Sequence, residues 1–177
     1  MLRRSVATAL VTTCAMVLAP VAAGLASASE SVRAFTATLS GDEEVPPEGE
    51  PDVETSASGE ATFEVADDGT EISYSVDVSG IENVEMAHIH LGARGENGPV
   101  VVWLYPDSPP PELIEGVTDG NLATGTITAD DLMEDLEGGT LDDLLGEMVA
   151  GNTYVNVHTT ANPGGEIRGQ IGADHIH

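Results

Sequence analysis

Short segments in which apolar and polar residues alternate run through most of the chain, and they constrain its fold more than any other feature. In segment 32–40, for example, Phe35, Ala37 and Leu39 fall on one side. Successive side chains of a β-strand point to opposite faces, so a two-residue period predicts strands with one buried face. This period, or a short apolar run, predicts further strands at 61–65, 72–78, 84–91, 99–105, 121–128, 153–159 and 166–171.

Turn residues separate these strands, and no helical pattern lies between the early ones. Asp67-Asp68-Gly69 predicts a hairpin turn, and the proline-containing segments 41–58 and 106–120 predict connecting loops. An α/β sheet would need helices between successive strands. The pattern therefore favours an all-β fold, an antiparallel Greek-key sandwich or barrel.

Helical spacing occurs only near the end of the chain. Thr128 with Asp131, and Thr140 with Asp143, have the spacing of a helix capping box. After the second box comes a helical stripe of apolar residues, formed by Leu141, Leu144, Leu145, Met148 and Val149. The sequence therefore predicts two short helices before the last two strands.

The first 28 residues have the features of a removable export signal. Arg3 and Arg4 form a positive start, residues 5–19 carry no charge, and Ala26-Ser27-Ala28 fits a cleavage site. We therefore expect a secreted or cell-surface protein with a domain at 33–172 and a flexible tail at 173–177. No membrane attachment is expected after the signal is removed.

The only cysteine, Cys14, lies inside this signal, so the mature chain would have neither thiol nor disulfide. Packing alone would then stabilise the fold, and any metal would be bound by His, carboxylate or Met side chains. Lipidation of Cys14 is a weaker alternative, because Val11-Thr12-Thr13 is a poor lipid-attachment motif.

Charge excludes several classes of partner. The chain has 31 acidic residues, five arginines and no lysine, giving a net charge of −26. Such a surface repels nucleic acid and anionic membranes. Because concentrated salt screens the self-repulsion, we expect a salt-adapted extracellular protein. The alternative is an acidic secreted protein that its charge keeps soluble.

Three predicted strands place functional side chains opposite apolar ones. His88 and His90 share one face of their strand, and Asn156 and His158 share one face of another. The last strand carries Glu166, Arg168 and Gln170 in the same way. If these strands are neighbours, the polar side chains converge on one outer surface.

Two histidines at i and i+2, with a third from a neighbouring strand, are typical ligands of zinc or copper. His88, His90 and His158 are therefore the candidate metal ligands, with Met86 as a further soft donor. The alternative is a structural role, in which the histidines hydrogen-bond to carboxylates without metal. Asn156, Glu166 and Arg168 form the surrounding polar patch, and an ion-pair network is expected for the last two.

Weaker metal candidates lie elsewhere. The tail Asp174-His175-Ile176-His177 repeats the His-x-His spacing, and it would be a mobile metal-scavenging appendage. Acidic clusters could attract calcium or sodium; they comprise Asp42, Glu43, Glu44, Asp67 and Asp68. They lack the ligand spacing of a calcium loop, which favours a solvated acidic face instead. No catalytic residue is assigned, because no nucleophile motif such as Gly-x-Ser-x-Gly occurs.

Four segments resemble the CHRD (chordin) domain family. They are Phe35 to Gly41 followed by Glu44-Val45-Pro46-Pro47, Ala87 to Gly92 with Asn97 to Val100, Tyr154 to Thr159, and Pro163 to Gln170. The resemblance covers 33–171. It implies an extracellular module, found alone in microbes and as repeats in chordin, a secreted antagonist of bone morphogenetic proteins. The sandwich or barrel expected from the strand pattern is immunoglobulin-like or superoxide-dismutase-like.

A second likeness concerns the histidine strand. Met86 to His90 is similar to the Phe-His-Ile-His strand of copper-zinc superoxide dismutases, and His158 would correspond to a later copper histidine. The bridging histidine, zinc loop and disulfide of that family have no counterpart. The sequence thus predicts a non-catalytic exported module that binds a metal ion, an extracellular protein or a matrix component. A copper-dependent, dismutase-like redox protein is the alternative.

Overall fold

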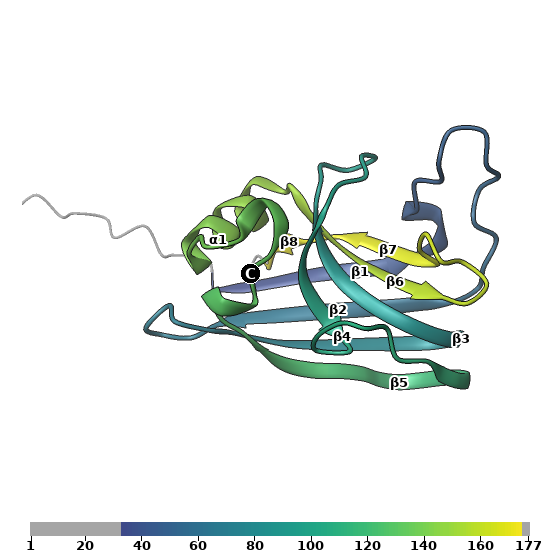
Figure 1. Cartoon of the computed structure of the whole chain (residues 1–177), viewed down its shortest axis with the longest axis horizontal. Helices are drawn as coiled ribbons and strands as arrows, with labels where there is room; N and C mark the ends of the chain where they lie inside the picture. Colours follow the sequence, from purple (N-terminus) through teal and green to yellow (C-terminus); the bar gives the residue numbers. More distant parts are fainter. Residues whose placement is uncertain (1–32, 175–177) are drawn as a thin grey trace, which may run out of the picture. The chain divides into compact units, whose positions relative to one another are not determined.

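The computed structural model describes residues 33–174, and β-strands are the main secondary structure of this part of the chain (Figure 1). Every strand pairing in it is antiparallel. The predicted all-β antiparallel class is thus confirmed. The strands are β1 (Ala34–Ser40), β2 (Ser58–Val65), β3 (Ile72–Leu91), β4 (Val100–Tyr105), β5 (Ile114–Ile127), β6 (Thr153–Thr159), β7 (Ile167–Gln170) and β8 (Gly172–Ala173).

The sheet closes on itself. Its strand order is β2-β1-β7-β6-β3-β4, and β2 also pairs with β3, so β1, β2, β3, β6 and β7 form a ring. β5 adds to β3 outside this ring, and β8 adds to β1. The expected barrel is therefore present, whereas its Greek-key and superoxide-dismutase-like character remain predictions.

The long strand β3 differs from the sequence prediction, which divided it into 72–78 and 84–91. It is one strand of 20 residues that bends in the middle. Gly80 and Asn83 have positive φ angles of 66° and 54°, and the register with β5 shifts around them. These residues tolerate left-handed backbone, so the strand bends without ending. Its first part pairs with β2 and β5, and its second part with β4 and β6.

The start of β5 and the first of the two predicted helices also differ from expectation. The connection predicted at 106–120 contains the start of β5, which begins at Ile114. Val117 is 57% exposed there, so this part of the strand has no buried face to give it a period. Of the two predicted helices, only the second is an α-helix, α1 (Leu141–Ala150). The first consists of short 3₁₀ turns, η2 (Ala129–Asp131) and η3 (Glu134–Leu136).

The capping box explains why α1 begins where it does. The Thr140 N–H and hydroxyl both donate to Asp143 Oδ2, each at 2.8 Å. Leu144 and Met148 are buried, whereas Val149, which the predicted stripe included, is 60% exposed. α1 lies near β8 at one end of the barrel (Figure 1). Among residues 33–174, no helix is long and apolar enough to cross a membrane.

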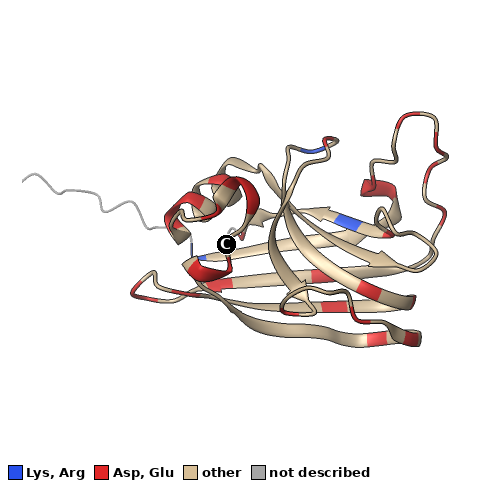
Figure 2. Cartoon of the chain, in the orientation of Figure 1, with Lys and Arg blue, Asp and Glu red and all other residues tan. Residues whose placement is uncertain are grey.

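Acidic side chains are distributed over loops and strands throughout the described region (Figure 2). Its cations are Arg33, Arg94 and Arg168. The expected signal at 1–28 and the tail histidines lie outside the described residues. Ala173, the first residue of the expected tail, pairs with Phe35 of β1.

Candidate metal centre

The strand register brings the three candidate histidines to one face of the barrel wall. β3 and β6 lie side by side, with His88 opposite Asn156 and Met86 opposite His158. Their alternate residues, such as Ile89 and Val157, are fully buried in the hydrophobic core. The two-residue period therefore turns the imidazoles to the face away from the core.

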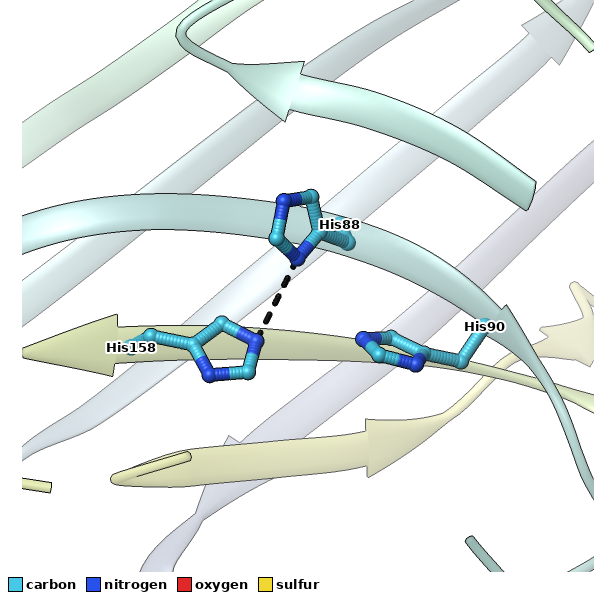
Figure 3. A group of neighbouring side chains, drawn as sticks. All are labelled: His88, His90 and His158. Carbon is cyan, nitrogen blue, oxygen red and sulfur yellow. Dashed lines mark hydrogen bonds between the residues drawn. The ribbon is translucent and has the colours of Figure 1, made fainter. Parts of the chain in front are cut away.

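The imidazole nitrogens converge on one point (Figure 3). One ring nitrogen from each of His88, His90 and His158 lies within 4.8 Å of the other two. His88 Nδ1 and His158 Nε2 are 3.3 Å apart. Two nitrogens bound to one tetrahedral zinc at ~2.0–2.1 Å lie about 3.4 Å from each other, so this pair already has the spacing of metal ligands.

Backbone carbonyls fix the tautomers of two of these rings. His90 Nδ1 lies 3.0 Å from the Gly98 oxygen, and His158 Nδ1 lies 3.0 Å from the Pro163 oxygen. A carbonyl only accepts hydrogen bonds, so both Nδ1 atoms carry the proton and both Nε2 atoms keep a free lone pair. This orienting contact is typical of metal-binding histidines.

His88 completes the group through Nδ1. Without metal, the His88 tautomer with the proton on Nδ1 donates to the lone pair of His158 Nε2; with metal, the neutral tautomer with the proton on Nε2 would present Nδ1 as a ligand. His88 Nε2 and His90 Nε2 are buried without a hydrogen-bond partner. Buried polar atoms are rarely left unpaired, so a missing ligand is a physical reason for the His90 nitrogen to lie there.

The predicted outer face is not open to solvent. His88, His90 and His158 are only 3%, 8% and 6% exposed, so the expectation of a solvent-facing patch is wrong. Three segments contact this face: 41–57 through Glu44, 92–98 through Gly98 and 160–165 through Pro163. Loops have no period in sequence, and their position over a strand cannot be derived from it.

Burial also sets the protonation state of the rings. Desolvation, with the neighbouring His158 and His90, lowers the pKa of His88 to about 3. Desolvation is also the main cause that lowers the pKa of His90 to about 4, and it lowers the pKa of His158. All three rings are therefore neutral near pH 7, which is the form that binds metal.

Aromatic packing holds two of the rings. The His90 ring stacks on Tyr154, with centroids 4.9 Å apart and planes inclined by 10°. Trp103, on the neighbouring strand β4, packs edge to face against the His88 ring, and the two ring centroids lie 4.3 Å apart. Trp103 is the only tryptophan of the chain, so its fluorescence reports on this site alone.

Arg168 fastens one covering loop rather than pairing with Glu166. It is 1% exposed, and its guanidinium donates to Asn97 Oδ1 at 2.9 Å and to the Glu96 carbonyl at 2.8 Å. Its Cζ atom lies 3.4 Å from the centre of the Tyr154 ring. Arg168 thus connects loop 92–98 to the stack that holds His90.

Glu166 fastens the other two covering segments, 41–57 and 160–165. Its carboxylate accepts hydrogen bonds from Thr55 at 2.8 Å, Thr159 at 2.6 Å and Asn162 at 3.1 Å. Within residues 33–174 the salt bridges join other pairs, Arg33 to Asp67 and Arg94 to Glu43. The ion-pair network predicted for Glu166 and Arg168 is therefore wrong, because each side chain hydrogen-bonds to a different loop.

The sequence reasoning missed Glu44 as part of this face by assigning it to a solvated acidic cluster. Glu44 Oε2 lies 3.5 Å from the Asn156 amide nitrogen, while Oε1 is buried without a hydrogen-bond partner. Desolvation raises the pKa of Glu44 to about 7, although the charge of Arg168 opposes the rise. The motif Glu44-Val45-Pro46-Pro47 was the one signal that set this residue apart. Asp42, Asp67 and Asp68 are exposed, as expected.

Replacing Gly98 by alanine should weaken both the fold and the histidine site. A Cβ there would coincide with the Leu91 carbonyl oxygen, so the loop that orients His90 must move. We expect a loss of about 1–3 kcal/mol or more in the free energy of unfolding, measured with urea. Gly146→Ala is the matched control, because nothing lies within 4 Å of its Cβ position in α1. Full stability of Gly98→Ala would contradict the close contact.

Comparison with known proteins assigns the family. Neither the curated proteins nor the solved structures gave a match. The CHRD domain model matches residues 35–171, which include all three histidines, Glu44 and the segments that cover them. Since this match spans most of the sequence, the chain belongs to the CHRD domain family.

Proposed function

We propose that this chain is a non-catalytic exported CHRD module that holds one copper or zinc ion with His88, His90 and His158. One observation carries the proposal: three imidazole nitrogens converge, and carbonyls leave a free Nε2 lone pair on two of the rings. A structural role would satisfy both nitrogens of each buried ring. Here His90 Nε2 has no partner.

The donor set supports copper or zinc over harder cations. Imidazole nitrogens suit zinc and copper, whereas magnesium and calcium prefer oxygen ligands. Met86, whose backbone lies opposite His158, is the nearest soft donor in the strand register. The rings are neutral near pH 7 and need not lose a proton to bind metal; His88 only has to carry its proton on Nε2 instead of Nδ1.

Export is the second part of the proposal. CHRD domains occur in extracellular or secreted proteins, and residues 1–28 have the pattern of a signal peptide. An exported module meets copper and zinc outside the cell. An extracellular protein or matrix component remains the alternative ligand, and it would be recognised by a surface other than the buried histidines.

Metal analysis of the purified mature chain tests the proposal. The untagged protein would be incubated with micromolar copper or zinc, passed through a desalting column and analysed for bound metal. We expect one equivalent, and binding of paramagnetic Cu²⁺ should quench the fluorescence of Trp103. Retention of neither metal would reject the proposal.

The tail histidines require a control, since they could bind metal by themselves. The double variant His175→Ala/His177→Ala should keep one equivalent of metal and the full quenching of Trp103. Superoxide turnover by the copper-loaded control would instead favour the dismutase-like alternative, which the His-x-His strand in a closed barrel supports.

Salt adaptation is a further part of the proposed extracellular role. The acidic side chains outnumber the cations sixfold, so repulsion between them opposes folding at low ionic strength. Raising NaCl from ~0.1 M to ~1 M shortens the screening length from about 10 Å to about 3 Å. We therefore expect the melting temperature to rise over this range. A melting temperature that falls or stays constant would contradict salt adaptation.

A further inference from the structure

We propose that Glu44 is the charge partner of this metal site, acting through Asn156 to offset the positive charge of a divalent ion held by three neutral imidazoles. The inference rests on the proposed metal binding and assigns a positioning residue that is not itself a ligand. It follows from where the covering segment 41–57 places this carboxylate.

Asn156 connects Glu44 to the ligands. Its backbone lies directly opposite His88 on β6, two residues before His158. Its amide nitrogen donates to Glu44 Oε2 over 3.5 Å, and its Oδ1 atom is buried without a partner. Glu44 is therefore one hydrogen bond away from a residue that the strand register places beside His88, which is the place of an outer-shell partner rather than a ligand.

Gly165 makes this arrangement possible. A Cβ atom at this position would lie 2.5 Å from the Asn156 side chain and 2.7 Å from Glu44 Oε1. The φ angle of Gly165 is +131°, which side chains other than glycine rarely adopt. The loop that follows β6 thus leaves space for a carboxylate and an amide at the same place.

No cation within residues 33–174 forms an ion pair with Glu44. The salt bridges there belong to other carboxylates. Arg168 is the cation that most lowers the pKa of Glu44, but its guanidinium donates its hydrogen bonds to loop 92–98. Glu166, the other acidic neighbour, is occupied by Thr55, Thr159 and Asn162. Glu44 therefore has no ion-pair partner among these residues, and the charge of Arg168 offsets its burial only in part.

Both sides of this pairing need the other. A buried carboxylate without an ion-pair partner is unfavourable, and a divalent cation held by three neutral imidazoles keeps its full positive charge. Outer-shell partners of this kind orient ligands and tune the metal. The metal would provide the cationic partner of Glu44. Glu44 would provide the negative charge that the three histidines do not carry.

The test compares the metal affinities of Glu44→Gln, Glu44→Asp and the unchanged mature chain by competition with a chelator. Loss of an outer-shell partner lowers metal affinity by ~10–100-fold, and we expect the Zn²⁺ affinity of Glu44→Gln to fall within this range. Glu44→Asp keeps the charge and should restore most of the affinity. Glu50→Gln, an exposed change in the same segment, is the matched control and should have no effect.

A second cation separates a charge effect from a structural one. Cu⁺ carries half the charge of Zn²⁺, so Glu44→Gln should weaken Cu⁺ binding less than Zn²⁺ binding. Equal losses for both cations, or no rescue by aspartate, would show that Glu44 acts by packing and would overturn the inference. Unchanged Zn²⁺ affinity of Glu44→Gln would also overturn it, while leaving the metal site intact. Failure of the unchanged chain to bind metal would instead reject the metal site itself.

Discussion

His158→Ala is expected to abolish stoichiometric metal binding. The substitution removes one of three ligands and also the acceptor that lies 3.3 Å from His88 Nδ1. Outer-shell changes lower metal affinity by ~10–100-fold, so loss of a ligand should cost more than ~100-fold. His90→Ala should have the same effect, because it removes the ring that the Gly98 carbonyl orients. Metal analysis after desalting, with chelator competition, measures both.

The matched control is His175→Ala, which changes a histidine of the terminal segment. It should keep the metal content of the unchanged chain, and Cu²⁺ should still quench Trp103. His158→Ala should lose the quenching together with the metal, even if its fold is intact by circular dichroism. If His158→Ala keeps one equivalent of tightly bound copper or zinc, the three-histidine site does not exist.

The metal-free protein should lose stability as the pH falls below about 6.5. Its three buried histidines stay neutral in the folded state, because the pKa values of His88 and His90 are lowered to about 3 and about 4. The unfolded chain binds protons near pH 6.5, so acid favours unfolding until the folded pKa values are reached. Together these shifts correspond to several kcal/mol, since one pKa unit is about 1.4 kcal/mol.

Glu44 contributes with the opposite sign. Its pKa is raised to about 7, so its contribution to stability is complete below pH 4.5 and is lost as the pH rises through 7. Three imidazoles outnumber this one carboxyl, and the net expectation is destabilisation by acid. Urea unfolding at pH 7.5 and pH 4.5 measures it, with 1 M NaCl at both values to screen the surface carboxylates.

Replacement of the three histidines by glutamine is the control for this experiment. The triple variant has no imidazole at the site and should lose less stability between the two pH values than the unchanged chain. Equal losses in both proteins would show that other groups control acid unfolding.

The two-residue period of the sequence was sufficient to place His88 and His90 on one face and Ile89 on the other. The period also fixes the faces of β6, so the orientation of His158 could be predicted. That β3 and β6 are neighbours could only be expected, because strand adjacency depends on contacts between segments 70 residues apart. The register shows how these strands meet.

What covers the histidines could not be predicted, for a physical reason. Segments 41–57 and 92–98 follow no period, and their positions depend on single hydrogen bonds such as Asn97 to the Val45 carbonyl. The ion-pair network expected for Glu166 and Arg168 was wrong for the same reason. That Glu166 and Arg168 share one face of a strand does not predict which loop each side chain contacts.

The strand β3 also carries a consequence for how the protein opens. Its amides and carbonyls bond to β2, β4, β5 and β6, so no end of it can separate without breaking several ladders. Hydrogen exchange at His88 and His90 should therefore require near-global unfolding, whereas the loop amides above them exchange through local opening. Two of the three imidazoles are thus fixed on the most slowly exchanging backbone of the domain, and an ion could enter by movement of the covering loops alone.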